Sequence, residues 1–270
     1  MRVQPWNTGW TVMTSQPRQS FGAQAEGTPV TLPHDVTIHT APFAAAPGGA
    51  ATGYYGGGEG IYTKYFEAPA DWQGQTVLVR FDGVFSYAEV SINGHLAALH
   101  PYGYTAFVAD LTPYLYFHRR NRLEVIANNT AQPNSRWYTG TGIYRPVELL
   151  TGPQLRIAPW GIFAHTDALT DGCAEVTAEV TVVNDTGAAV DRRVYASLSH
   201  AGQTLATAFQ MVHIPAHGEA VARVHLRVPG APIWDVDDPQ LCTVTAAVDD
   251  DEASTSFGIR TVQIDRTGLR

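Results

Sequence analysis

Apolar and polar residues alternate with a period of two along most of this chain. In "QTVLVRFDGV", every second residue from Val77 to Phe81 is apolar and falls on one face of an extended strand. "NRLEVIANN" shows the same pattern, and Asn93-Gly94 in "YAEVSINGHLAAL" predicts a tight hairpin because both residues tolerate positive φ. Apolar stripes of helical period hardly appear. With 25 Gly and 17 Pro as breakers, the pattern predicts an all-β fold of sandwiches or barrels rather than βαβ units.

A domain boundary is expected at Gly152-Pro153, inside "LLTGPQLRIAPWG". Beyond it, "AEVTAEVTVVNDTG" and "EAVARVHLRVPG" alternate cleanly between an apolar face and a polar face. Strands with one solvent-exposed face, and with turn signals every ~8–12 residues, are typical of an immunoglobulin-like sandwich of about 100 residues. We therefore expect two domains, a larger all-β domain with long loops over residues 1–151 and an immunoglobulin-like β-sandwich over residues 152–262.

Composition and charge exclude several classes of partner. The formal net charge is −8 and Lys and Arg are scattered singly, so no basic stripe points to nucleic acid. No run of about 18 apolar residues predicts a membrane span, and the start lacks the ~7–15 apolar residues of a secretory signal. Cys173 and Cys242 form no CxxC motif. These features favour a cytoplasmic protein with two reduced thiols, and a disulfide within one domain stays the alternative.

Sequence motifs for catalysis, cofactors and metals are missing. The chain has no GxSxG, HExxH, P-loop or strand-to-helix GxGxxG, so we expect no cofactor and no metal. The nearest histidine pairs, His34/His39 and His213/His217, lie in extended, turn-rich sequence where that spacing does not converge on a metal. No two carboxylates stand in a context that marks them as a hydrolytic couple.

Two acidic motifs are expected to be structural. In "LPHDV" (32–36), the His-Asp pair is expected to cap a turn and bond to neighbouring backbone, with a ligand contact as the less favoured alternative. "WDVDDPQL" (234–241) is rich in Asp but lacks the spacing of a calcium loop. Turn initiation by Asp-Pro between two strands is the favoured interpretation there.

One stretch, "PNSRWYTGTGIYRPVEL" (133–149), carries more recognition chemistry than a connector needs. Trp137, Tyr138 and Tyr144 offer flat apolar faces with polar edges, which suit the C–H faces of a sugar ring. Two arginines of the same stretch offer forked donors for hydroxyls or a carboxylate.

A structural interpretation of this stretch competes with the binding one. We expect Trp137 and Tyr144 to fill the core where the loop re-enters the sheet, and Arg145 to pair with a carboxylate. For Ser135 and Arg136, which precede the aromatic anchor, the structural and the binding interpretations are equally open.

Five blocks of sequence together resemble glycoside hydrolase family 2. They are "GIYTKYFEAP", "VRFDGVFSYAEVSINGH", "PNSRWYTGTGIYRPVELL", "IWDVDDPQL" and "FGIRTVQID". That family typically carries a "GIYRKxF" strand, an "FDGV…AxVxxNG" hairpin and an "SRWYxGxGIYR" loop in its N-terminal sugar-binding jelly roll, followed by an immunoglobulin-like domain that ends near "FGxR". The blocks occur in family order over essentially the whole chain. The "SRWYxGxGIYR" form looks most like the β-galactosidase branch.

The resemblance implies an architecture and a role. Residues 1–151 would be a jelly-roll, galactose-binding-like β-sandwich, residues 152–262 the immunoglobulin-like β-sandwich, and residues 263–270 the start of a linker to a TIM barrel. In such enzymes the barrel supplies both glutamates of a retaining mechanism. We therefore expect the non-catalytic N-terminal part of a β-galactosidase-like enzyme of carbohydrate metabolism, whose jelly roll supports and partly lines the active site of the barrel.

The resemblance also suggests substrate-binding residues. Some family members place an Asp two residues before the Trp of this loop, where it touches the sugar, and Ser135 stands there in this chain. Others present an Asn from the loop before the "GIYTK" strand, where this chain has Gly-Gly followed by Glu59. The expected substrate-binding residues are Ser135, Arg136, Glu59, Tyr54 and Tyr55, with the two tyrosines bordering the substrate entrance.

Two other function classes stay open at this point. Exposed aromatic residues on one sheet face would favour an autonomous carbohydrate-binding module. A structural pair of domains that assembles into a homo-oligomer is the third interpretation, because family members often form oligomers partly through these domains. On the favoured interpretation, the chain alone hydrolyses nothing and shows no measurable sugar binding. Its partners are then the barrel and, through the whole enzyme, a β-galactoside.

Overall fold

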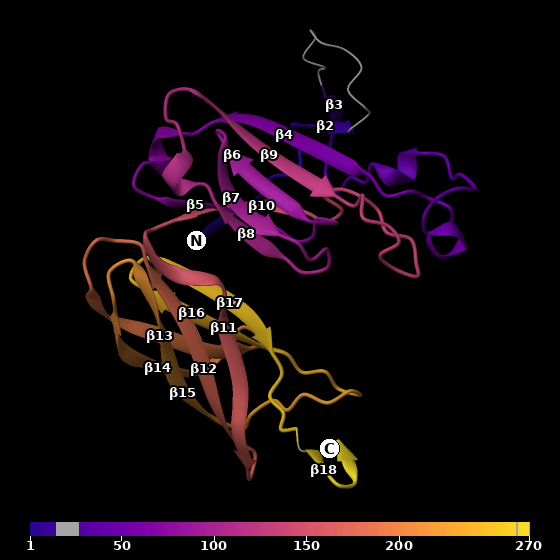
Figure 1. The fold of residues 1–270 in the computed structure, drawn as a ribbon. Helices are drawn as coiled ribbons and strands as arrows, with labels where there is room; N and C mark the ends of the chain where they lie inside the picture. Colours follow the sequence, from indigo (N-terminus) through magenta and orange to yellow (C-terminus); the bar gives the residue numbers. More distant parts are fainter. Residues whose placement is uncertain (15–26, 263, 270) are drawn as a thin grey trace. The chain divides into compact units, whose positions relative to one another are not determined.

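A computed structural model describes residues 1–14, 27–262 and 264–269 of the chain (Figure 1). Strands make up nearly all of its regular structure, and only four short 3₁₀ helices interrupt them within these residues. The all-β fold class expected from the alternating pattern is confirmed. No helix in the described part is long and apolar enough to cross a membrane.

The chain divides into two compact units. The first unit is Arg2–Thr151, and the second is Gly152–Arg270 together with Met1. Each unit has a hydrophobic core of its own, one that includes Trp10, Tyr62 and Phe81, and another built largely from small aliphatic side chains of the second unit.

The first unit contains two antiparallel sheets. One has the strand order β1-β10-β5-β8 and the other has the order β3-β2-β4-β9-β6-β7. Their bounds are β1 (Arg2–Pro5), β2 (Trp10–Thr14), β3 (Thr28–Val30), β4 (Glu59–Glu67), β5 (Thr76–Phe81), β6 (Ala88–Ile92), β7 (His95–His100), β8 (Phe107–Asp110), β9 (Arg120–Asn128) and β10 (Val147–Gly152). The 3₁₀ helices are η1 (Thr37–His39), η2 (Gly49–Thr52), η3 (Ala70–Trp72) and η4 (Thr112–Tyr114).

Alternation explains the core of the first unit. Successive side chains of a strand point to opposite sides, so every second residue faces the core. Val77, Val79 and Phe81 of β5 are fully buried, as are Leu123 and Val125 of β9. The same rule places the polar residues of β9 between them, on the other face of the sheet.

The hairpin predicted at Asn93-Gly94 is present between β6 and β7. Both residues have positive φ, 53° and 84°. The side chain of Asn93 adds to the turn, because its Oδ1 accepts a hydrogen bond from the backbone N–H of Arg122 at 2.9 Å. In Figure 1, β6, β9 and β4 lie side by side, which matches their register.

The second unit is a sandwich of two antiparallel sheets, β11-β12-β15 and β14-β13-β16-β17. A short pair, β18 (Ile264–Asp265) with β19 (Gly268–Leu269), follows in the segment where we expect a linker. The bounds of the sandwich strands are β11 (Leu155–Thr170), β12 (Cys173–Asn184), β13 (Val190–His200), β14 (Gln203–Ile214), β15 (Gly218–Pro229), β16 (Cys242–Val248) and β17 (Asp251–Phe257).

Small aliphatic side chains of alternating positions fill the second core. Val176, Val180 and Val182 of β12 are buried, and the polar residues between them lie at the other face. Cys173 and Cys242 belong to this unit and both carry free thiols. Burial raises the pKa of the Cys242 thiol, which lowers its reactivity at neutral pH.

Candidate functional site

The loop between β9 and β10 is held by two neighbouring segments of the first unit. The backbone N–H groups of His34 and Val36 donate to the carbonyl oxygens of Ile143 and Thr141 at 2.8 and 2.9 Å. Phe85 exchanges two backbone hydrogen bonds with Gly142, at 2.9 and 2.8 Å. Segments far apart in sequence therefore fix the course of this loop.

Two side chains, those of Asp35 and Asn129, form a frame of hydrogen bonds around this loop. Asp35 is the centre of the first group of bonds. Its Oδ1 accepts hydrogen bonds from the backbone N–H groups of Thr37 and Thr141, both at 2.8 Å. Its Oδ2 accepts one from the hydroxyl of Tyr138 at 2.7 Å. The turn-capping role expected for the "LPHDV" motif is confirmed, and it extends to a residue more than a hundred positions away.

Asn129 is the centre of the second group of hydrogen bonds that hold the loop. Its Nδ2 donates to the carbonyl oxygen of Gly140 at 3.0 Å, while its Oδ1 accepts from the side-chain amides of Gln132 and Asn134 at 3.0 and 2.6 Å. The backbone N–H of Asn129 donates to the carbonyl oxygen of Gly58 at 2.8 Å. The buried side chain of Asn129 thus ties parts of the loop to one another, while its backbone ties the loop to the residue before β4.

One loop glycine is required by its surroundings. Gly142 has φ 141°, a conformation that residues with a side chain rarely adopt. A Cβ at this position would collide with the Tyr62 hydroxyl and lie 2.7 Å from the carbonyl oxygen of His34. The "GxG" spacing of the loop therefore allows its backbone to approach the sheet closely.

Histidine and tyrosine side chains pack under the loop. The ring of His34 stacks on His39 with centroids 5.4 Å apart, and its Nδ1 lies 2.9 Å from the Tyr62 hydroxyl. Burial, and then the neighbouring His39, lowers the pKa of His34, while burial raises that of Tyr62. Both groups are thus neutral near pH 7. Across the residues that the structure covers, no group of three or more His, Cys, Asp or Glu side chains is arranged to hold a metal.

Exposed aromatic side chains line the rim of the loop. Trp137 is 59% exposed and its Nε1 donates to the hydroxyl of Tyr104 at 2.9 Å. Tyr104 packs edge-on against Phe85 and Tyr102, at centroid distances of 5.2 and 5.6 Å. One hydrogen bond therefore ties the indole to Tyr104, while more than half of Trp137 stays exposed. We call Trp137, Tyr104, Tyr102 and Phe85 the aromatic rim.

The structure corrects three expectations about this loop. Trp137 does not fill the core, because Ile143 is the fully buried side chain where the loop re-enters the sheet. Arg145 is exposed, with its guanidinium 5.5 Å from the centroid of the Tyr144 ring, and it forms no ion pair with any described carboxylate. Tyr144 does not fill the core either, because it is half-buried and lies outside the hydrophobic cluster, and its hydroxyl donates to the carbonyl oxygen of Gly103 at 2.8 Å.

Two of the expected substrate-binding residues lie within this loop. Ser135 is half-buried, and its hydroxyl donates to the carbonyl oxygen of Trp137 at 2.8 Å, so it shapes the loop. Arg136 is exposed and makes no hydrogen bond or ion pair with any residue in the described ranges. Its five N–H donors are available to a ligand or a partner.

The other three expected residues lie beside the loop rather than in it. Glu59 opens β4, and its Oε2 accepts a hydrogen bond from the amide of Asn128 at 3.3 Å. Tyr55 packs edge-on against Tyr138, with centroids 5.4 Å apart. Tyr54 is 46% exposed and has φ 63° in the turn after η2.

Sequence reasoning missed two residues that hold the site together, Asn129 and Tyr104. Asn129 ends the "NRLEVIANN" run, and paired asparagines at the end of a strand are a usable signal for side-chain to backbone bonding. Tyr104 stands in "HPYGYTAF", where two tyrosines flank a glycine in a turn. Its partnership with Trp137 spans 33 positions and has no local signature.

Models of one protein family match both units. "Glycosyl hydrolases family 2, sugar binding domain" matches residues 34–153, and "Glycosyl hydrolases family 2" matches residues 156–260. The chain belongs to glycoside hydrolase family 2. The first match contains the whole frame around Asp35, Asn129 and the aromatic rim.

Two curated relatives lead to the same family. "Beta-galactosidase BoGH2A" of Bacteroides ovatus is 37% identical over 87% of this chain, and "Putative beta-glucuronidase" of Formosa agariphila is 31% identical over 86%. The chain spans 28% and 22% of the lengths of these relatives. It therefore corresponds to a minor part of each of them.

A solved structure shows the same fold over the full length. A glycosyl hydrolase family 2 member from Bacteroides cellulosilyticus superposes with a TM-score of 0.89 at 29% identity. The match covers 100% of this chain and 37% of that one. The two-unit β architecture is thus that of the corresponding region of a family 2 protein.

Proposed function

We propose that this chain is the non-catalytic N-terminal part of a family 2 glycosidase, in which the loop between β9 and β10 faces a TIM barrel. The first unit then supports the barrel and completes one wall of its active site. The second unit links the two. This role in carbohydrate metabolism goes beyond membership of the family.

The observation that carries the proposal is the contrast between the frame of the loop and its tip. Asp35 and Asn129 make six hydrogen bonds that hold the loop in place, three of them to backbone groups and three to side chains. Arg136, by contrast, has no partner among the described side chains, and Trp137 presents open indole faces. Side chains so placed on a fixed frame suit a contact that another part of the enzyme or its substrate completes.

The carboxylates near the loop argue against chemistry by this chain alone. Retaining glycosidases need two carboxyl groups about 5–5.5 Å apart across the sugar. Asp35 already accepts three hydrogen bonds, and Glu59 accepts one from Asn128. Both act as structural acceptors, so we place the catalytic glutamates in the barrel.

We take the substrate of the enzyme to be a β-galactoside. The relative with 37% identity is named a β-galactosidase, while the one with 31% identity is named a putative β-glucuronidase. A cytoplasmic location belongs to the same proposal, and the two free thiols, Cys173 and Cys242, support it.

The proposal is tested by hydrolysis of 4-nitrophenyl β-galactoside and 4-nitrophenyl β-glucuronide with the purified chain. We expect no turnover above the buffer rate with either substrate. A rate that follows the protein through successive chromatographic steps would place catalytic residues in this chain and would reject the proposal.

An autonomous carbohydrate-binding module is the second candidate, and the aromatic rim favours it. Trp137 and Tyr102 are more than half exposed, as platform residues of such modules are. The two functions differ in what the chain does alone. Sugar binding that is abolished by Trp137→Ala in this chain would favour the module, whereas a supporting wall has no measurable affinity at the rim.

A further inference from the structure

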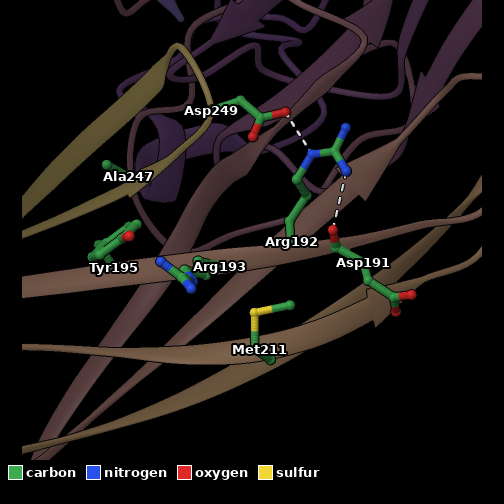
Figure 2. A pocket seen from close by; sticks show the side chains of 7 residues that line it. All are labelled: Asp191, Arg192, Arg193, Tyr195, Met211, Ala247 and Asp249. Atoms are coloured by element: carbon green, nitrogen blue, oxygen red, sulfur yellow. Dashed lines mark hydrogen bonds and ion pairs between the residues drawn. The ribbon is translucent and has the colours of Figure 1, made fainter.

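A pocket of about 450 Å³ lies at one end of the outer face of the sheet β14-β13-β16-β17, in the second unit. The pocket is an open hollow on the surface rather than an enclosed cavity. It is lined by Asp191, Arg192, Arg193, Tyr195, Met211, Ala247 and Asp249. Figure 2 shows Arg193 and Tyr195 on one strand and Met211 on its neighbour.

Arg192 forms one wall of this pocket and bonds to two neighbouring residues. Its Nε donates to Asp249 at 2.7 Å and its Nη1 donates to the backbone oxygen of Asp191 at 3.0 Å, as the dashed lines in Figure 2 mark. The carboxylate of Asp191 lies 2.9 Å from the Nδ1 of His213. Each carboxylate therefore has one fixed partner and keeps acceptor capacity for a ligand hydroxyl.

An aromatic pair borders the pocket. Tyr195 and Phe209 are directly opposite each other on β13 and β14, with ring centroids 5.5 Å apart and planes inclined by 46°. They are 41% and 51% exposed. The two rings are in contact with each other, so their exposed parts together can contact one ring of a sugar chain from outside the pair.

Arg193 supplies free donors beside these rings. Its guanidinium carbon lies 5.2 Å from the centroid of Phe209, and its side chain has no ion pair or hydrogen bond among the residues that are described. Stacking uses the face of the guanidinium and leaves its N–H edges for oxygen acceptors.

Hydroxyl side chains continue the same face beyond the rings. Ser197 lies two residues after Tyr195, and it is opposite Thr207 on β14 and Thr245 on β16. Positions i and i+2 of a strand share a face, so the three hydroxyls extend the surface away from the pocket. The strip can bond to a second sugar unit of a chain.

We propose that this surface of the second unit binds a neutral oligosaccharide chain. Two arginines and two aspartates balance in charge around an apolar floor, a combination that suits a neutral ligand rich in hydroxyls. The interleaved charges argue against a second protein copy, because the buried core of a protein interface is depleted of charged residues. The proposal is independent of the role given to the aromatic rim, and it revises the expectation that the chain alone binds no sugar.

The test is a ¹H–¹⁵N NMR titration of the chain with β-1,4-galactotetraose. We expect shifts concentrated on the amides of β13, β14 and β16 around Tyr195. Tyr195→Ala and Arg193→Ala should each weaken binding about tenfold, the effect of losing a principal contact. Both side chains are exposed, and the dispersion of the spectrum reports whether each variant folds.

Phe163→Ala is the matched control, since Phe163 is 62% exposed on β11 of the other sheet. Trp137→Ala is the control for sugar binding at the aromatic rim. Both variants should bind the oligosaccharide like the parent chain. The absence of any shift, or shifts confined to the residues around Trp137, would overturn the proposal. Tighter binding of the acidic tetragalacturonate than of β-1,4-galactotetraose would contradict the claim that the ligand is a neutral oligosaccharide. A dimer seen by sedimentation and lost in Phe209→Glu would assign the face to a second copy instead.

Discussion

At the scale of single residues, Asp35 shows how one carboxylate holds a loop in place through hydrogen bonds. Its two oxygens accept the N–H groups of Thr37 and Thr141 and the hydroxyl of Tyr138. The first two donors are backbone groups of buried residues, Thr37 and Thr141. An unpaired, half-buried N–H costs free energy comparable to a lost hydrogen bond.

We therefore expect Asp35→Ala to lower the free energy of unfolding of the first unit by about 2–4 kcal/mol. Urea denaturation, followed by tryptophan fluorescence, measures this change. Tyr138→Phe is the matched control, because it removes only the exposed hydroxyl bond and should cost about 1 kcal/mol. Equal losses in the two variants would show that the backbone bonds to Asp35 carry no stability.

At the scale of elements, the local sequence pattern predicted the strands, because the alternation of apolar and polar residues in a strand involves only residues that are adjacent in sequence. β5, β9 and the β6–β7 hairpin follow directly from "QTVLVRFDGV", "NRLEVIANN" and Asn93-Gly94. The loop between β9 and β10 was harder. Its side chains are placed by partners such as Asp35 and Tyr104, which are distant in sequence, so local pattern could not tell that Trp137 would point outward.

The loop element depends on Gly142, and this dependence is testable. Gly142→Ala would force a Cβ against the Tyr62 hydroxyl and the carbonyl oxygen of His34, at φ 141°. We expect a loss of about 3 kcal/mol in the free energy of unfolding. Thermal unfolding followed by circular dichroism measures it.

Gly94→Ala is the control that separates the free-energy cost of the Cβ clash at Gly142 from the cost of placing alanine at positive φ. Gly94 also has positive φ, 84°, but a Cβ there would meet no atom within 4 Å. Only the conformational cost of about 1–2 kcal/mol should appear. If both variants lose the same stability, the close approach at Gly142 is not what fixes the loop.

At the scale of the whole molecule, ordered sequence blocks predicted the family, and the family models and a full-length structural match bear this out. The residues expected to touch substrate remain a prediction. Ser135 and Glu59 are engaged within the first unit, whereas Arg136 is not. The sequence alone could not distinguish these cases, because it does not show whether a side chain finds a hydrogen-bond partner within the folded unit. Within the loop, we therefore expect the contact with substrate at Arg136 and its neighbour Trp137.

A chimera tests this most directly. In the Bacteroides ovatus β-galactosidase, the matched 28% of the length would be replaced by this chain, and kcat/KM measured with 4-nitrophenyl β-galactoside. The account predicts an active chimera in which Arg136→Ala lowers kcat/KM at least about tenfold. Arg122→Ala, which removes an exposed ion pair with Glu124 on β9, should change it less than about twofold. An unchanged kcat/KM in a folded Arg136→Ala chimera would contradict the claim that this loop completes the active site of a barrel.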